Sequence, residues 1–184
     1  MPPVTLSVTE AELAKLFSNS WRYLQFAIAN QFYMMATAHG ADFARIHHAM
    51  TAGYGRAAHF PTPGFAAGPC LLKDTMQLSA LQQNGFLLGH AAMLINEGLP
   101  NAIVNALKHD LRSDLRGMRV GILGMTFKAD VDDIRDSLSY KLGKILRFHV
   151  IANTPHRLQR SFSSSYTVAR SGAMAVIRTS TPGF

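Results

Sequence analysis

The sequence has few of the features that mark secreted or membrane-bound chains. One cysteine in 184 residues excludes an internal disulfide and favours a reducing compartment. A long uncharged run, residues 23–41, is interrupted by polar residues such as Gln25 and Asn30, so we expect no membrane span. The N-terminus lacks a basic region followed by an apolar stretch, which argues against a signal peptide. We therefore expect a cytoplasmic protein that does not enter membranes.

Charged residues are scarce and unevenly distributed. They make up 16% of the chain against 48% apolar residues, which excludes wholesale disorder and allows a packed core. All 11 acidic residues lie within residues 1–136, where 11 of the 18 Lys and Arg residues balance them. The net charge of +7 therefore comes from the residues after Asp136.

This basic tail makes nucleic-acid binding an alternative function. It would rest on the tail's arginines, Arg157, Arg160, Arg170 and Arg178. Few aromatic residues interleave with them and no recognised nucleic-acid motif is present. We therefore expect no nucleic-acid partner.

The first 108 residues have helical periodicity. Ser7 and Glu10 have capping-box spacing, and apolar residues then recur at three- and four-residue steps, which predicts a helix over residues 8–38. A second helix is predicted over 42–52. Asp74 and Gln77 have N-cap and N3 spacing, which predicts a third helix from Asp74 to about residue 88. A fourth helix is predicted over 90–108, with a kink or restart at Pro100.

The pattern changes after a polar stretch, residues 109–117, which suits a linker. Residues 118–123 read as a short strand, 124–136 as a polar loop and 138–148 as a helix, the opening of an α/β unit. The fold class is therefore mainly α: a helical domain over residues 5–108, then a partial α/β unit over 118–152. Residues 153–184 show little periodicity, and we expect them to be irregular and disordered.

The residues between the second and third helices form a loop, 53–74, that is too long to be a simple connection. It ends in Gly68-Pro69-Cys70-Leu71-Leu72-Lys73-Asp74. A cysteine just ahead of a helix N-terminus, with a lysine nearby, is in surroundings that favour the thiolate form. Local chemistry alone leaves two readings of Cys70 open, a buried inert thiol and a nucleophile.

Polar residues also mark the first helix. Lys15, Asn19 and Arg22 share one face, which is either a solvated stripe or, if Lys15 is partly buried, a polar site. The adjacent imidazoles of His47 and His48 are badly oriented for one metal ion, and we expect no metal site. Gly121-Ile122-Leu123-Gly124 after a strand is typical of nucleotide folds, but the full G-x-G-x-x-G pattern is absent.

Three separated blocks resemble the UDP-glucose and GDP-mannose 6-dehydrogenase family of nucleotide-sugar dehydrogenases, over roughly residues 5–148. The first block is Ala-Glu-Leu-Ala-Lys-Leu-Phe-Ser-Asn at 11–19. The second is 64–74 with its G-x-C-L-x-K-D ending. The third is Gly-Ile-Leu-Gly-Met-Thr-Phe-Lys at 121–128, followed by Asp-Asp-Ile-Arg-Asp-Ser at 132–137.

The resemblance implies a reaction and a site. Such enzymes oxidise the sugar C6 alcohol to a carboxylate with NAD as cofactor, through a cysteine-bound intermediate. Cys70 matches the nucleophile, and Lys15 matches the ammonium that stabilises negative charge on oxygen, with Asn19 beside it. Asp74 matches the carboxylate that positions water.

The resemblance also implies binding residues and partners. Phe127 and Lys128 match a substrate-contacting pair, Arg135 an arginine near the cofactor phosphates, and Arg56 an arginine that reaches into the partner subunit's site. Gly68 lets the backbone approach the substrate closely. The expected partners are a nucleotide-sugar substrate and a second copy of the chain, joined through the central helices.

The family has an NAD domain before, and a complete nucleotide-binding domain after, the part that this chain resembles. We therefore expect a fragment of such a dehydrogenase, with residues after about 148 out of the ancestral frame or unrelated. A non-catalytic helical dimerisation module left by gene truncation is the alternative. The sequence does not identify the sugar nucleotide.

Overall fold

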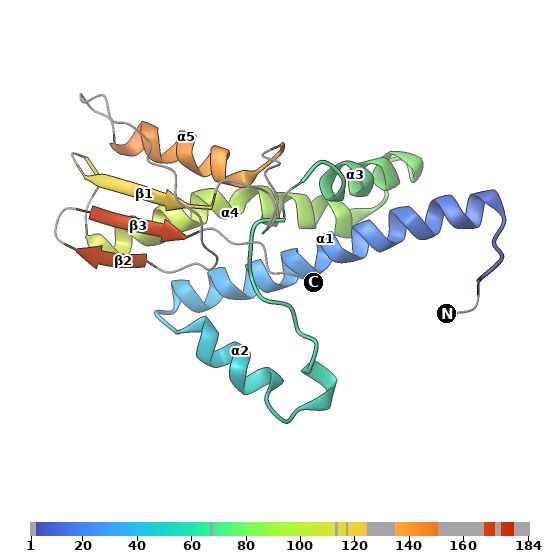
Figure 1. The fold of residues 1–184 in the computed structure, drawn as a ribbon, viewed down its shortest axis with the longest axis horizontal. Coiled ribbons are helices and arrows are strands. Elements are labelled where there is room, and N and C mark those ends of the chain that lie inside the picture. Colours follow the sequence, from blue (N-terminus) through green and yellow to red (C-terminus); the bar gives the residue numbers. More distant parts are fainter. Residues whose placement is uncertain are drawn as a thin grey trace.

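The computed structural model describes residues 3–66, 68–112, 114–116, 118–124, 135–150, 168–171 and 174–178. The chain forms a helical body with a small sheet at one end (Figure 1). Within the described residues, no helix combines the length and the hydropathy needed to cross a bilayer. The predicted fold class, mainly α with a partial α/β unit, is confirmed.

The longest element is the helix α1, Val8–Ala38, which matches the predicted bounds. Its predicted capping box is present, because the Ser7 side chain accepts from the Glu10 backbone N–H and the Glu10 carboxylate accepts from the Ser7 N–H. Buried residues along one side of α1 include Tyr23 and Phe26. α1 therefore forms the spine against which two later helices pack.

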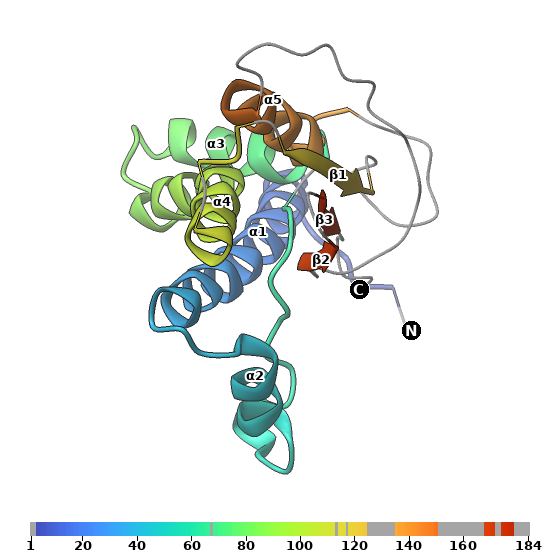
Figure 2. The ribbon, with the colours of Figure 1, turned by 90° about the vertical axis from the view of Figure 1, so that its left-hand side faces the viewer.

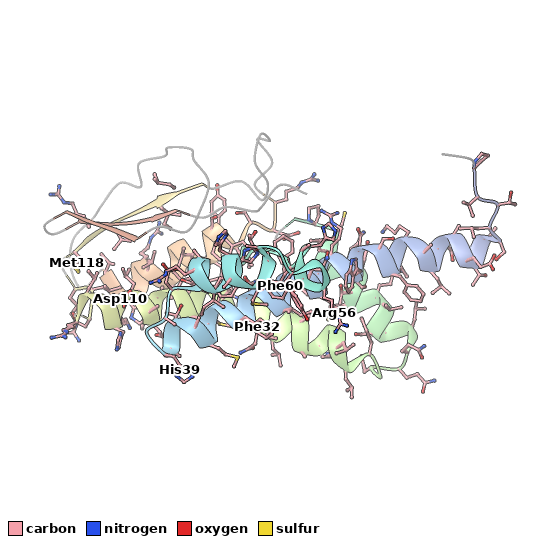
Figure 3. All side chains as sticks on the ribbon, turned by 90° about the horizontal axis from the view of Figure 1, so that it is seen from below. Phe32, His39, Arg56, Phe60, Asp110 and Met118 are labelled. Carbon is pink, nitrogen blue, oxygen red and sulfur yellow. The ribbon has the colours of Figure 1, made fainter. Side chains whose placement is uncertain are left out.

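An arm projects from the end of α1. It contains the helix α2, Phe43–Thr51, capped by Asp42, and the 3₁₀ turn η1, Gly55–Ala57. Figure 2 shows α2 away from the helical body. The arm touches the body where the Phe60 ring stacks on Phe32 of α1, with ring centroids 5.6 Å apart (Figure 3).

The next two helices pack along α1, and their bounds differ from those predicted. α3 spans Leu71–Leu81 and α4 spans Leu87–Leu111. The prediction that Asp74 caps the third helix is wrong, because α3 starts three residues earlier. The predicted break near residue 88 lies instead at 82–86. Pro100 lies inside α4, which continues through it and extends three residues into the predicted linker.

The α/β unit follows α4. The strand β1, Arg119–Leu123, and the helix α5, Leu138–Val150, match the predicted strand and helix closely. Two further strands, β2 at Val168–Ser171 and β3 at Met174–Arg178, complete a sheet of order β1-β3-β2. β1 pairs with β3 in parallel and β3 with β2 antiparallel. The expectation that the tail has no regular structure is therefore wrong for β2 and β3.

Two apolar clusters form the core and meet at α4. One joins α4 to β1 and α5 and includes Leu99, Ile122 and Leu142. The other joins α1, α3 and α4 and includes Tyr23 and Leu71. Because α4 contributes to both clusters, the segment after it shares a core with the helical body.

Candidate functional site

Three of the predicted site residues, Lys15, Asn19 and Asp74, come together at one buried carboxylate. The Asp74 side chain lies on α3 and is fully buried. Its Oδ2 accepts a hydrogen bond from Lys15 Nζ at 2.6 Å and another from Asn19 Nδ2 at 2.5 Å. Lys15 and Asn19 are one turn apart on α1, so a single helix face supplies both donors. The structure therefore favours the polar-site reading of this face over the solvated stripe.

A second ammonium group lies near the same carboxylate. Lys73 Nζ is 4.0 Å from Asp74 Oδ1, which has no hydrogen-bond partner within the described part of the chain. The side chains of Lys15 and Lys73 are 58% and 68% exposed. Two exposed ammonium groups against one buried carboxylate leave a net positive charge at this surface.

The charge state of Asp74 follows from these contacts. Burial of the carboxyl raises its pKa, but the hydrogen bonds from Lys15 and Asn19 and the charges of Lys15 and Lys73 outweigh burial. The pKa of Asp74 therefore lies below its ordinary value of 3.8. Asp74 is an anion at neutral pH, and it acts as an anchor for Lys15 rather than as a proton acceptor.

Acid should therefore destabilise the fold through Asp74. Because its folded-state pKa is lowered, its stabilisation is present above pH 3.8 and lost as the pH falls through that lower pKa. Asp74→Asn should cost about 1–3 kcal/mol of the free energy of unfolding at pH 7 and reduce the loss on acidification. Urea unfolding at pH 7 and pH 3 measures both, with exposed Glu12→Gln as control. If acidification lowered the free energy of unfolding of Asp74→Asn as much as that of the native protein, this prediction would be contradicted.

Cys70 lies one helical turn before Asp74. It is the N-cap residue of α3, and its carbonyl accepts from the Asp74 N–H at 2.9 Å. The thiol is exposed and free, so the expectation that Cys70 is buried is wrong. An exposed thiol at a helix start, one turn from a residue that binds an ammonium, can meet an electrophile from solvent.

The chain reaches Cys70 through a glycine that its backbone requires. Gly68 is buried and has a φ of +105°, a conformation that side chains strongly disfavour. We expect Gly68→Ala to cost about 1–3 kcal/mol in the free energy of unfolding. The matched control is Gly55→Ala, because a Cβ at Gly55 meets no atom within 4 Å. Urea unfolding of both variants tests this, and equal losses would contradict it.

The other predicted residues are not gathered at this carboxylate. Arg56 is exposed in η1 on the arm (Figure 3), and Arg135 is exposed in the turn before α5. Arg22 is exposed on α1. Phe127 and Lys128 lie outside the described residues, as do Arg157 and Arg160 of the tail. Within the described residues, no three His, Cys, Asp or Glu side chains gather in a way that could hold a metal ion.

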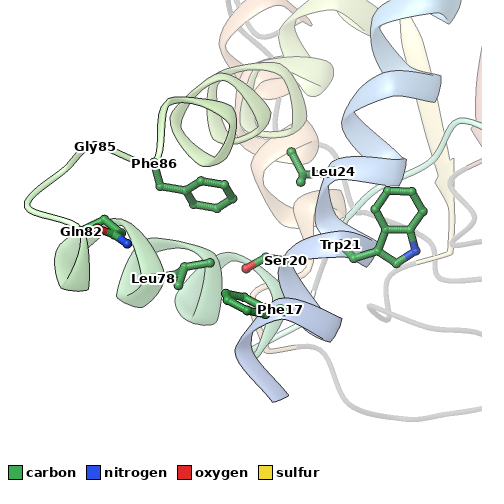
Figure 4. Close-up of a pocket in the computed structure, with 8 residues that line it drawn as sticks. All are labelled: Phe17, Ser20, Trp21, Leu24, Leu78, Gln82, Gly85 and Phe86. Atoms are coloured by element: carbon green, nitrogen blue, oxygen red, sulfur yellow. The ribbon is translucent and has the colours of Figure 1, made fainter. Parts of the chain in front are cut away.

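A cavity of about 440 Å³ lies elsewhere, between α1 and the turn that joins α3 to α4 (Figure 4). None of the predicted site residues lines it. Its lining is mostly apolar and consists of Phe17, Ser20, Trp21, Leu24, Leu78, Gln82, Gly85 and Phe86.

The sequence prediction missed two buried amides, Asn30 on α1 and Asn96 on α4, which are both fully buried and hydrogen-bonded to each other. The spacing could have indicated Asn30, because it lies eleven residues after Asn19 and therefore on the face of α1 that carries Lys15 and Asn19.

Comparisons with known proteins match this part of the chain. Residues 9–97 match the model of the UDP-glucose/GDP-mannose dehydrogenase family, central domain. The chain is 31% identical over 140 residues to the UDP-glucose 6-dehydrogenase AglM of Haloferax volcanii, covering 74% of this chain and 32% of that protein. It is 29% identical over 152 residues to a GDP-mannose 6-dehydrogenase of Pseudomonas aeruginosa, covering 79% and 34%.

A solved structure agrees. The UDP-glucose dehydrogenase of Pyrobaculum islandicum superposes with a TM-score of 0.69 at 29% identity, covering 80% of this chain and 35% of that one. The chain thus spans about a third of the length of the relatives that it matches.

Proposed function

We propose that the chain is part of a nucleotide-sugar 6-dehydrogenase, because it belongs through residues 9–97 to the UDP-glucose/GDP-mannose dehydrogenase family. Such an enzyme oxidises the sugar C6 alcohol to a carboxylate by way of the aldehyde. The observation that carries the proposal is the buried Asp74, which binds Lys15 and Asn19 one helical turn after the exposed Cys70.

In the proposed reaction Cys70 captures the aldehyde. The Cys70 thiolate adds to C6, so that a C–S bond forms and the carbonyl electron pair moves onto oxygen. The Lys15 ammonium, anchored at 2.6 Å by Asp74 yet 58% exposed, stabilises that developing negative charge. Asn19 donates to the same oxygen, Asp74 Oδ2, and so helps to hold the carboxylate that anchors Lys15.

The covalent adduct is the species that undergoes the second oxidation. NAD is the cofactor that the family implies, and when bound it accepts the hydride from C6 at each oxidation. Of this chain's described residues, Arg135 is the one assigned to it, and its exposed guanidinium suits a phosphate oxygen pair. The described residues thus fit a phosphate group of the cofactor and not the whole dinucleotide. Cys70, Lys15 and Asp74 act on the substrate.

Hydrolysis of the thioester completes the reaction. Water adds to the acyl carbon, the C–S bond breaks, and Cys70 leaves as thiolate while the product becomes a carboxylate. The family resemblance assigns the positioning of this water to Asp74, whose buried Oδ1 has no hydrogen-bond partner among the described residues. Since its pKa is lowered, Asp74 orients the water and does not take its proton.

The charge of the site suits the substrate class. Lys15 and Lys73 against Asp74 leave a net positive surface, which attracts the diphosphate of a nucleotide sugar. Gly68, two residues before Cys70 and without a side chain, remains a proposed substrate contact. Phe127 and Lys128 remain the proposed contacts to the sugar.

A second copy of the chain is the proposed partner. Large exposed apolar side chains recur along one face of α1, within an arc of about 60°. These are Phe17, Trp21, Ile28, Phe32 and Met35, all at least 42% exposed. By helix geometry this face is opposite the one that carries Lys15 and Asn19, so pairing through it leaves the site open. The projecting arm would then carry Arg56 toward the partner.

This pairing predicts the mass of the protein in solution. Light scattering should give twice the chain mass of 20.1 kDa. Ile28→Glu places a charge in the centre of the apolar face and should shift the mass to that of the monomer. Lys144→Glu, at an exposed position of α5, is the control and should leave the dimer intact. A monomeric native protein, or a dimeric Ile28→Glu variant, would contradict the pairing.

An activity assay tests the proposed function. The purified protein is incubated with NAD and UDP-glucose, GDP-mannose or UDP-N-acetylmannosamine, alone and with the isolated NAD-binding domain of a relative. We expect NADH to form with one of these substrates and to require Cys70. A dimer that forms no NADH in any combination would favour the alternative, a non-catalytic helical dimerisation module.

A further inference from the structure

The loop that leads to Cys70 passes through the core of the protein. Gly64 is buried, and Phe65 and Ala66 are 2% and 3% exposed. Phe65 belongs to the cluster around α4 and α5, and Ala66 to the cluster of α1, α3 and α4. A buried loop needs partners for its backbone N–H and C=O groups, which helices and strands satisfy internally.

A single side chain supplies those partners at Gly64. The Gly64 N–H donates to Asn30 Oδ1 at 2.8 Å, and Asn30 Nδ2 donates to the Gly64 carbonyl at 2.9 Å. Asn30 thus makes with Gly64 the pair of hydrogen bonds that a neighbouring strand would make. It is fully buried, so water does not compete for these groups.

A second amide holds the first in place. Asn30 Nδ2 also donates to Asn96 Oδ1 at 2.9 Å, and Asn96 Nδ2 donates to the Tyr23 carbonyl on α1 at 3.0 Å. Both hydrogens of Asn30 Nδ2 are then used, which fixes the orientation of its amide. We call Asn30, Asn96 and the Gly64 backbone the amide clamp; it ties the loop to α1 and α4 together.

The clamp and the candidate site share α1. Asn30 lies eleven residues after Asn19, close to three full turns, so both lie on nearly the same face and about 16 Å apart along the axis. Lys15 and Asn19 bind Asp74 in α3, and Asn30 binds Gly64 in the preceding loop. The segment that carries Cys70 is thus fixed to α1 on both sides of the thiol.

We propose that Asn30 and Asn96 are positioning residues, which hold Cys70 at one place relative to Lys15. The expected effect of these residues on turnover rests on the proposed function, whereas their expected effect on the position of Cys70 is independent of it. Asn30→Ala would leave the Gly64 N–H, the Gly64 carbonyl and Asn96 Oδ1 without partners. The loop should then sample several positions while α1 and α4 stay packed.

The sequence offers a direct measure of position, because it contains one tryptophan and one cysteine. Time-resolved energy transfer from Trp21 on α1 to a naphthalene-sulfonate dye attached to Cys70 reports the distribution of their separation. We expect Asn30→Ala to widen this distribution roughly twofold, and Asn96→Ala to widen it less. Asn105→Ala, an exposed amide on α4, is the control and should leave the width unchanged.

Hydrogen exchange gives a second measure that needs no label. In Asn30→Ala the Gly64 amide should exchange at least about tenfold faster, with the amides of α1 and α4 unchanged. If Asn30→Ala does not fold, the same measurements on Asn96→Ala and Asn30→Asp test the proposal. Asn30→Asp keeps the acceptor for the Gly64 N–H and loses both N–H donors of Asn30. A native-width distribution and native Gly64 exchange in a folded variant would overturn the proposal.

Where the native protein turns over, kinetics separate positioning from mere stability. Asn30→Ala should lower kcat about 10²-fold at a temperature where it is folded, with KM for the nucleotide sugar within about twofold. An unchanged kcat together with a widened distribution would overturn the positioning role. A native protein without turnover would refute the proposed function, while the energy-transfer and exchange results would still decide the clamp.

Discussion

Replacing Cys70 by alanine should stop the reaction at the aldehyde. Without the thiol no C–S bond forms, so the carbon cannot be held as the adduct from which the second hydride leaves. Carboxylate formation should fall by about 10⁴-fold or more, because the nucleophile is removed outright. The NADH formed per nucleotide sugar should fall from about two toward about one, since the first oxidation does not need the thiol.

The measurement is NADH by absorbance together with the acid and aldehyde products by mass spectrometry. Thr62→Ala, at an exposed position of the same loop, is the control and should keep the native stoichiometry. A Cys70→Ala protein that still makes the carboxylate at the native rate would exclude covalent catalysis by this residue.

Replacing Lys15 by methionine should have the next largest effect. Methionine keeps much of the side-chain length but removes the ammonium that lies 2.6 Å from Asp74. Loss of one such electrostatic contact typically raises the barrier by roughly 3–4 kcal/mol, so kcat should fall roughly 10²–10³-fold. Steady-state kinetics measure this, with circular dichroism to show that the variant is folded.

Lys73→Met is the matched control. Its ammonium is 4.0 Å from Asp74 and its side chain is more exposed, so solvent screens its charge. We expect its kcat to fall by no more than about tenfold. Equal losses in the two variants would mean that the general positive charge of the surface, and not the anchored ammonium of Lys15, supports the reaction.

The sequence predicted the elements whose signals are local. The periodicity and the capping box gave α1 with its observed bounds, and the apolar run and its following helix gave β1 and α5. The start of α3 was predicted wrongly because Asp74 and Gln77 imitate a cap. The Asp74 carboxylate bonds instead to α1, residues that are far away in the sequence.

Long-range pairing accounts for the other differences. β3 pairs with β1 across more than fifty residues, and no local pattern in the tail indicates that partner. In the sequence, Asn30 was interpreted only as a polar residue that interrupts an uncharged run, because its partner Gly64 is 34 residues away. The resemblance, in contrast, assigned Lys15, Asn19 and Asp74 to one site, although it did not indicate that Asp74 binds the other two.

The most direct test of the account is a search for the covalent intermediate on Cys70. The protein is mixed with NAD and the C6 aldehyde of the nucleotide sugar that it oxidises, quenched in acid during turnover and digested. Mass spectrometry should find the Cys70 peptide carrying the acylated nucleotide sugar, and the adduct should accumulate when hydrolysis is slowed in Asp74→Asn. A protein that turns over with its Cys70 peptide always unmodified, in both native and variant forms, would contradict the account.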